Sequence, residues 1–107
     1  MKNYIIQNTL DLSDHLVSGN LLRLTKEDAL YRAWADYFDD GDKYLVECDA
    51  IKFNWCGGFL TSKNRLLATV ATVKSVETSF EEFLNTVIWT NTPRPICKLN
   101  LIMEDQQ

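Results

Sequence analysis

The sequence predicts an α+β fold: a single domain over residues 1–107, with a mostly antiparallel sheet of about four to six strands and two main helices packed on it. Three observations predict this fold. An amphipathic helical segment lies in the first half, alternating apolar and polar residues follow it, and a capped apolar segment precedes a last alternating stretch. With 46% hydrophobic and 24% charged residues, the chain has the composition of a globular protein.

The segment before the main helix predicts three short elements. Residues 3–8, NYIIQN, are typical of an opening strand. Residues 9–20 contain apolar residues that would form one face of a short helix, namely Leu12, Leu16 and Val17. This helix is expected to end at Gly19 and to hold His15 away from its apolar face, on the surface. Residues 20–24, NLLRL, are expected to be a strand or an extended lead-in.

The main helix is predicted from Thr25 to Gly41. Thr25 is a good N-cap, because its hydroxyl can accept a hydrogen bond from an unpaired backbone N–H of the first turn. Gly41 is a suitable end, since glycine adopts the left-handed conformation freely. The apolar residues between them recur at helical spacing and form one stripe: Ala29, Leu30, Ala33, Trp34, Tyr37 and Phe38.

The end of this helix is unusually acidic. Four aspartates lie there with only Lys43 as a nearby opposite charge: Asp36, Asp39, Asp40 and Asp42. A carboxylate at the negative end of a helix dipole costs about 0.3 to 1 kcal/mol. Two interpretations remain open for this segment. It is either a solvated acidic turn or a surface that binds a partner.

The middle of the chain is patterned as strands. Residues 43–56 alternate between apolar and polar side chains, with residues 49–50 marking a turn, a bulge or simply a bend in one long strand. Residues 62–64, Ser-Lys-Asn, are expected to form a polar turn. Residues 65–76 are rich in Val and Thr and apolar on both faces, which is typical of a central strand.

A second helix is predicted after Ser79, which forms a capping box with Glu82. Its apolar face is expected to contain Phe80, Phe83, Leu84, Val87 and Ile88. Trp89 would lie nearly opposite the centre of that face. Residues 96–103 alternate again, from Ile96 to Met103, and predict a closing strand.

The charge of the chain restricts its partners. The formal net charge is −4 and the isoelectric point is near 4.8, while the basic residues are scattered. Direct binding of nucleic acid or of an anionic membrane surface is therefore disfavoured. An acidic surface favours a basic protein partner instead. The sequence shows no membrane-spanning run and no signal peptide, so we expect a cytoplasmic protein.

Metal and cofactor sites are not predicted. Four residues fit the spacing of a twelve-residue calcium loop: Asp36, Asp40, Gly41 and Glu47. Phe38 occupies a ligand position of that loop, and the segment after it is patterned as a strand, which argues against calcium. Zinc would require Cys48, Cys56, Cys97 and His15, yet these cysteines form no C-x-x-C pair. The cysteines are expected to be buried, reduced thiols, and no cofactor is expected.

One enzymatic alternative involves Cys56, which precedes Gly57 and Gly58. A nucleophilic thiolate needs a base, and His15 is the only histidine of the chain. A cysteine in an apolar strand followed by glycines is more often structural. Catalysis by Cys56 and His15 is therefore the minor hypothesis.

The main hypothesis is a small acidic cytosolic protein that binds another protein stoichiometrically. We expect an inhibitor, or a neutraliser of the immunity or counter-defence type, directed at a basic protein that handles nucleic acid. The predicted partner-binding residues are Asp36, Asp39, Asp40, Asp42, Glu47, Asp49, Tyr31 and Trp89. The alternative within the binding class is a homo-oligomeric adaptor or structural subunit, joined through the edge strand at residues 96–103.

Overall fold

Two long antiparallel strands form the centre of the fold. The computed structural model describes residues 2–36, 41–53, 57–71 and 78–91. Strand β3, Lys43–Lys52, pairs with strand β4, Gly58–Val70, along its full length. Asp49 and Ala50 both lie inside β3, so this part of the chain is one long strand, as one of the sequence alternatives proposed.

Strand β4 contains irregularities that bend the sheet. The register between β3 and β4 shifts between Leu45 and Val46, and again between Glu47 and Asp49. Lys63 lies at the second shift and has a φ of 53°. The turn predicted at residues 62–64 is therefore wrong, because these polar residues form a bulge within a continuous strand. Bulges bend a strand and increase its twist.

The remaining strands pair with this central hairpin. Strand β1, Lys2–Gln7, lies beside β3, while β2, His15–Ser18, and β5, Ile88–Trp89, both lie beside β4. All pairings are antiparallel, and the described sheet has five strands. The sheet and the two α-helices described with it confirm the predicted α+β class.

The segment around β2 differs from the prediction. Residues 15–18 form a strand rather than a helix, and a 3-10 helix, η1, follows at Gly19–Leu21. Leu12 and Leu16 are four residues apart, a spacing that suits both a helix and an alternating strand. A Cβ on Gly19 would lie 3.0 Å from the ring of Phe59, so this glycine allows a close contact instead of ending a helix.

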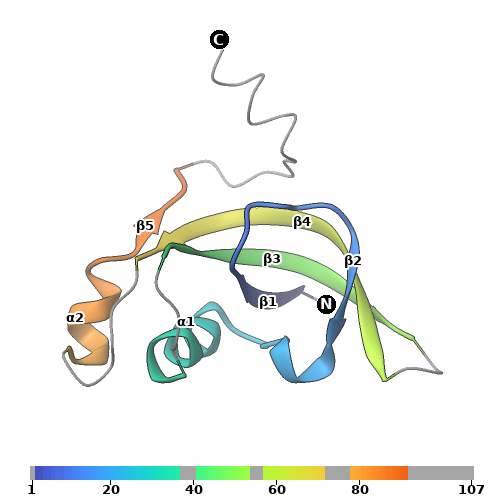
Figure 1. The fold of residues 1–107 in the computed structure, drawn as a ribbon, viewed down its shortest axis with the longest axis horizontal. Helices are drawn as coiled ribbons and strands as arrows, with labels where there is room; N and C mark the ends of the chain where they lie inside the picture. The colour runs from blue at the N-terminus through green and yellow to red at the C-terminus, as the bar shows by residue number, and fades with distance from the viewer. Residues whose placement is uncertain (1, 37–40, 54–56, 72–77, 92–107) are drawn as a thin grey trace, which may run out of the picture.

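The chain after η1 returns to the first strand. The lead-in predicted at residues 20–24 contains one isolated bridge, in which Arg23 pairs with Tyr4. Their backbone groups exchange hydrogen bonds of 2.8 and 2.9 Å. The loop between β1 and β2 passes over the sheet, as Figure 1 shows. The sheet is thus curled, and residues 20–24 link the end of β2 back to β1.

Helix α1, Lys26–Ala35, begins as predicted. The Thr25 hydroxyl accepts a hydrogen bond of 3.0 Å from the Asp28 backbone N–H. Ala29 and Leu30 are buried on its inner face. The helix ends at Ala35 rather than Gly41, which fits the unfavourable interaction of carboxylates with a helix C-terminus. Tyr37 and Phe38 lie outside the described residues.

Helix α2, Phe80–Leu84, also begins as predicted but is shorter. The Ser79 hydroxyl accepts a hydrogen bond of 3.2 Å from the Glu82 backbone N–H. The helix stops because the Thr86 hydroxyl donates to the Phe83 carbonyl and the chain then joins the sheet as β5. Ile88, predicted on the buried helical face, is 68% exposed. The strand predicted at residues 96–103 lies outside the described residues.

Two apolar clusters cover the two faces of the sheet. Neighbouring residues of a strand point to opposite faces, so Leu45 packs with the helices while Val46 packs beneath the β1–β2 loop. The helix-side cluster consists of Ala29, Leu30, Leu45, Leu67, Ala68, Val70, Phe83 and Val87. The other buried residues are Ile5, Leu12, Val46 and Cys48. Both helices lie on the same side of the β3–β4 arch in Figure 1.

Cys48 is a core residue. Its side chain is fully buried, as predicted for the cysteines, whereas Cys56 and Cys97 lie outside the described residues. Burial, together with the nearby charges of Asp49 and Glu47, raises the pKa of the Cys48 thiol to about 11. Cys48 is therefore an unreactive thiol at neutral pH.

We predict that Leu45→Ala lowers the free energy of unfolding by about 2 to 5 kcal/mol, because it leaves a cavity between the sheet and α1. Leu45 is fully buried, whereas Leu24 is 70% exposed and serves as the matched control. Leu24→Ala should change stability by less than about 0.5 kcal/mol. Urea denaturation measures both values, and equal effects would contradict the assigned core.

We predict that Cys48 reacts with a thiol reagent far more slowly in the folded protein than in urea. Its folded pKa, about 11, lies above the ordinary value of 9.0. The contribution of the neutral Cys48 thiol to the free energy of unfolding is therefore complete below the unfolded pKa and is lost as the pH rises through the folded pKa. In Cys48→Ala, the free energy of unfolding should therefore fall less than in the unaltered protein between about pH 9 and pH 11. Peptide mapping of alkylation and denaturation at several pH values test both points.

Candidate functional site

The predicted acidic surface lies partly within the described residues. Asp36 directly follows α1, and its carboxylate is 3.7 Å from the Arg32 guanidinium, with both side chains exposed. Asp42 is exposed just before β3. Asp39 and Asp40 lie outside the described residues. Partner binding by this end of α1 thus stays a prediction.

Glu47 belongs to a row of polar side chains that crosses three strands. Its carboxylate lies 3.2 Å from Nη1 of Arg65 and accepts a hydrogen bond of 3.2 Å from the Tyr4 hydroxyl. The three residues are direct neighbours in the register of β1, β3 and β4. Burial and the charge of Glu47 raise the pKa of the Tyr4 hydroxyl, which keeps it a neutral donor. The charge of Glu47 is therefore balanced within the sheet.

Asp49 is balanced in the same way. Its carboxylate oxygens lie 3.5 Å from Nζ of Lys2 and 3.9 Å from Nζ of Lys63. Lys2 is its direct partner in the register of β1 and β3. The charges of Glu47 and Asp49 are thus balanced by basic residues of the neighbouring strands. Tyr31 and Trp89 lie elsewhere, on α1 and β5.

The calcium spacing noted in the sequence lies partly outside the described residues, which exclude 37–40. Glu47, the proposed last ligand, lies within β3 and pairs with Arg65. Residues 2–36, 41–53, 57–71 and 78–91 contain no group of three or more His, Cys, Asp or Glu side chains that could hold a metal ion.

His15 occupies a half-buried position on β2 instead of the helix surface expected for it. Its Nδ1 lies 2.7 Å from the Ser13 carbonyl oxygen, so Nδ1–H donates there. Its Nε2 lies 2.9 Å from Nε2 of Gln7, from which it accepts. Both nitrogens are thus engaged in holding the β1–β2 loop. Cys56 lies outside the described residues, so the Cys56–His15 hypothesis stays a prediction.

A surface pocket lies between the first turns of α1 and the start of α2. It has a volume of about 280 Å³. Its lining consists of the carboxylates of Glu27 and Asp28, the rings of Tyr31 and Phe80, and Thr25. We call it the α1–α2 pocket. Of the residues predicted from the sequence to bind a partner, it contains Tyr31.

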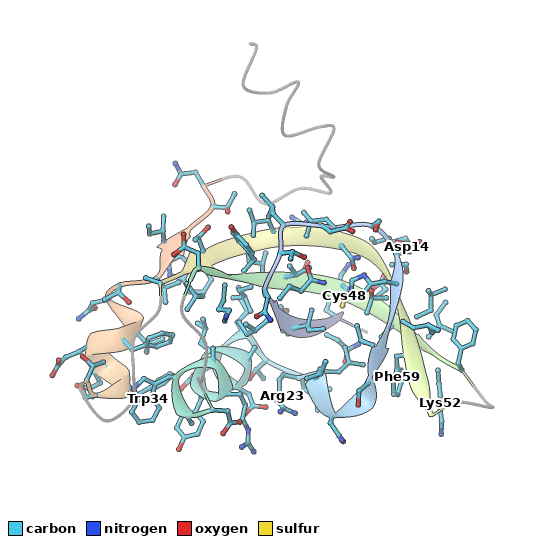
Figure 2. The ribbon with its side chains drawn as sticks, viewed as in Figure 1. Asp14, Arg23, Trp34, Cys48, Lys52 and Phe59 are labelled. Carbon is cyan, nitrogen blue, oxygen red and sulfur yellow. The ribbon has the colours of Figure 1, made fainter. Side chains whose placement is uncertain are left out.

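Aromatic packing builds the wall of this pocket. Tyr31 and Phe80 meet edge to face, with ring centroids 5.4 Å apart and planes at 70°. Trp34 packs against both rings, at 5.5 and 5.6 Å. Its Nε1–H donates a hydrogen bond of 3.0 Å to the Thr78 carbonyl, which ties the start of α2 to α1. Figure 2 labels Trp34 where the two helices meet.

The charges around the α1–α2 pocket are mainly acidic. The Asp28 carboxylate lies 3.7 Å from Nε of Arg23, and Glu27 has no ion pair within the described part of the chain. Lys26, between Thr25 and Glu27 in sequence, places its Nζ 6.0 Å from the ring centroid of Trp89. This contact brings Trp89, 46% exposed, to the first turn of α1 rather than to its acidic end.

Sequence patterns missed Glu27, Asp28 and Phe80 as site residues. Glu27 and Asp28 suit the positive end of the helix dipole, and Phe80 fits the core face of its helix, so no sequence pattern marks the three residues as a site. The pocket arises only because Phe80 contacts Tyr31, which is distant in sequence, and no local pattern indicates that contact.

No protein-family model, curated protein or solved structure matches this chain. No helix in the described ranges is long and apolar enough to cross a membrane.

Proposed function

We propose that this protein acts by binding a basic protein stoichiometrically, as an inhibitor or as a neutraliser of the immunity or counter-defence type. The observation that supports this proposal is the α1–α2 pocket. There, the carboxylate of Glu27, which has no ion pair with any residue that the structure describes, lines the pocket together with the exposed ring of Tyr31. Interfaces are enriched in such aromatic anchors, surrounded by polar groups.

The distribution of charge favours a basic partner. Glu47 and Asp49 are balanced by Arg65, Lys2 and Lys63 on the sheet. The exposed acids of the helices have fewer such partners: Glu27, Asp28, Asp36, Glu81 and Glu82. These five acids outnumber the basic residues beside them, Arg23, Lys26 and Arg32, and such an excess of negative charge accelerates encounter with a positive surface.

A protein that handles nucleic acid is the partner class that fits this excess of negative charge best. Such proteins bind phosphates through clustered Lys and Arg side chains. An acidic protein seated on that cluster would exclude the nucleic acid and so inhibit the partner. The net charge of −4 is too small for long-range attraction alone, so a shaped contact such as the α1–α2 pocket is also needed.

We predict that the affinity for a basic nuclease partner falls with rising salt and depends on Glu27. Glu27→Gln should weaken binding by roughly two- to fivefold, as expected for one exposed ion pair. Asp14→Asn is the matched control, since Asp14 is exposed and lies far from Trp34 in Figure 2. Isothermal titration calorimetry at two salt concentrations measures both effects.

The acidic end of α1 is tested in the same experiment. Changing Asp36, Asp39, Asp40 and Asp42 together to Asn removes the surface first indicated by the sequence. Unchanged affinity for this variant would exclude that end as the contact. Affinity that is insensitive to salt would contradict the basic-partner proposal itself.

A homo-oligomeric adaptor or structural subunit is the second candidate, supported by an apolar row at the far end of the sheet. Leu60 pairs with Leu16 on one side and with Ile51 on the other, so the three side chains share a face. Leu16 is 53% and Ile51 62% exposed. The originally predicted contact, at residues 96–103, lies outside the described residues.

We predict that, if this row is a contact between copies, light scattering shows a dimer that Ile51→Lys dissociates. A lysine there would place an unpaired charge in the apolar contact. Leu24→Lys, at a more exposed position, is the control and should leave the mass unchanged. A monomer at every concentration of the unaltered protein would exclude this candidate.

A further inference from the structure

The α1–α2 pocket is a small depression that is open to solvent. Its volume, about 280 Å³, lies just below the roughly 300 to 1,000 Å³ typical of sites for drug-sized ligands or cofactors. A single long side chain inserted by a protein partner is a better match in scale. The question is then which side chain the lining would select.

The charge of the lining selects a cation. A helix N-terminus by itself attracts anions, but the Asp28 backbone N–H already donates to the Thr25 hydroxyl at 3.0 Å. The carboxylates of Glu27 and Asp28 oppose any further negative charge. The adjacent Lys26 is directed at the Trp89 ring. Arg23 approaches Asp28 at 3.7 Å, which leaves Glu27 as the carboxylate open to an incoming cation.

The aromatic wall distinguishes between the two cationic side chains. Tyr31 is 45% exposed, and its edge-to-face contact with Phe80 holds the ring in place. A guanidinium is planar and weakly hydrated, so it can stack on a ring and still donate two hydrogen bonds to a carboxylate. An ammonium group is more strongly hydrated and cannot stack in this way.

We propose that the α1–α2 pocket receives an arginine side chain of the partner, stacked on Tyr31 and paired with Glu27. This assignment rests on the proposed function, because it names the group by which a basic protein would be recognised. It makes Tyr31 the anchor ring and Glu27 the counter-ion, while Phe80 supports the ring from α2.

The test uses the intact chain and a small probe, N-acetyl-arginine methylamide, followed by nuclear magnetic resonance of the backbone amides. Millimolar affinity is expected for a single side chain. The amide signals of Glu27, Asp28 and Tyr31 should shift with saturation. N-acetyl-lysine methylamide should bind about two- to fivefold more weakly, and the neutral citrulline derivative should cause no saturable shift.

Variants keep the test independent of folding. Tyr31→Phe keeps the ring and should retain binding, whereas Tyr31→Leu should weaken it by about two- to fivefold. Glu27→Gln should weaken it to a similar degree, and Asp14→Asn should have no effect. Equal binding of the arginine and citrulline derivatives, or shifts elsewhere on the protein, would overturn the assignment.

The outcome for the proposed function is read separately. If the arginine probe fails but a basic nuclease binds with normal salt dependence, the pocket assignment is wrong and the proposed function stands. If the probe binds as expected but affinity for basic nucleases is absent, the pocket selects arginine and the proposed function is wrong.

Discussion

The pairing of β3 with β4 is the interaction on which the other described parts of the fold depend. Each remaining strand hydrogen-bonds to one of these two. The helix-side cluster contains residues of both strands, and the other cluster contains Val46 and Cys48 of β3, against which Leu66 of β4 packs. The register shifts near Val46 and Cys48 bend the pair, so that one face can hold the helices and the other the β1–β2 loop. Helix α2 depends on tertiary packing, because five residues are too few for a stable isolated helix, and its Phe83 is buried with Leu45 and Leu67 of this hairpin.

The same pairing decides which charges are balanced within the sheet. Cross-strand neighbours lie about 4.5 to 5.5 Å apart, so an acid on β3 meets any base at the same register on β1 or β4. Glu47 meets Arg65, and Asp49 meets Lys2. Of the acids on α1 and at its end, Asp28 pairs with Arg23 and Asp36 with Arg32, whereas Glu27 has no ion pair within the described residues. The pairing of the sheet acids with basic residues is thus a consequence of strand register.

Much of the fold could be predicted from the sequence, because capping and alternation are local. Thr25, Ser79 and the alternation after Lys43 were interpreted correctly. The errors arose where a local pattern was ambiguous: the Leu12–Leu16 spacing suits two periods, and the bulge at Lys63 resembles a polar turn. Tyr31 and Trp89 are exposed, in line with the sequence, but the α1–α2 pocket could not be predicted, since the contact between Tyr31 and Phe80 is tertiary.

The proposed recognition in the α1–α2 pocket would be linked to stability through Phe80. This ring stacks on Phe83, which is buried in the helix-side cluster, and it also forms part of the pocket wall. Helix α1 supplies the carboxylates from ten residues capped by Thr25, whereas α2 has five residues capped by Ser79 and is held against α1 by aromatic packing and the Trp34–Thr78 hydrogen bond. A ligand held between the two helices would stabilise the docked position of α2 by mass action. Occupancy of the pocket and folding of α2 must therefore be coupled, each favouring the other.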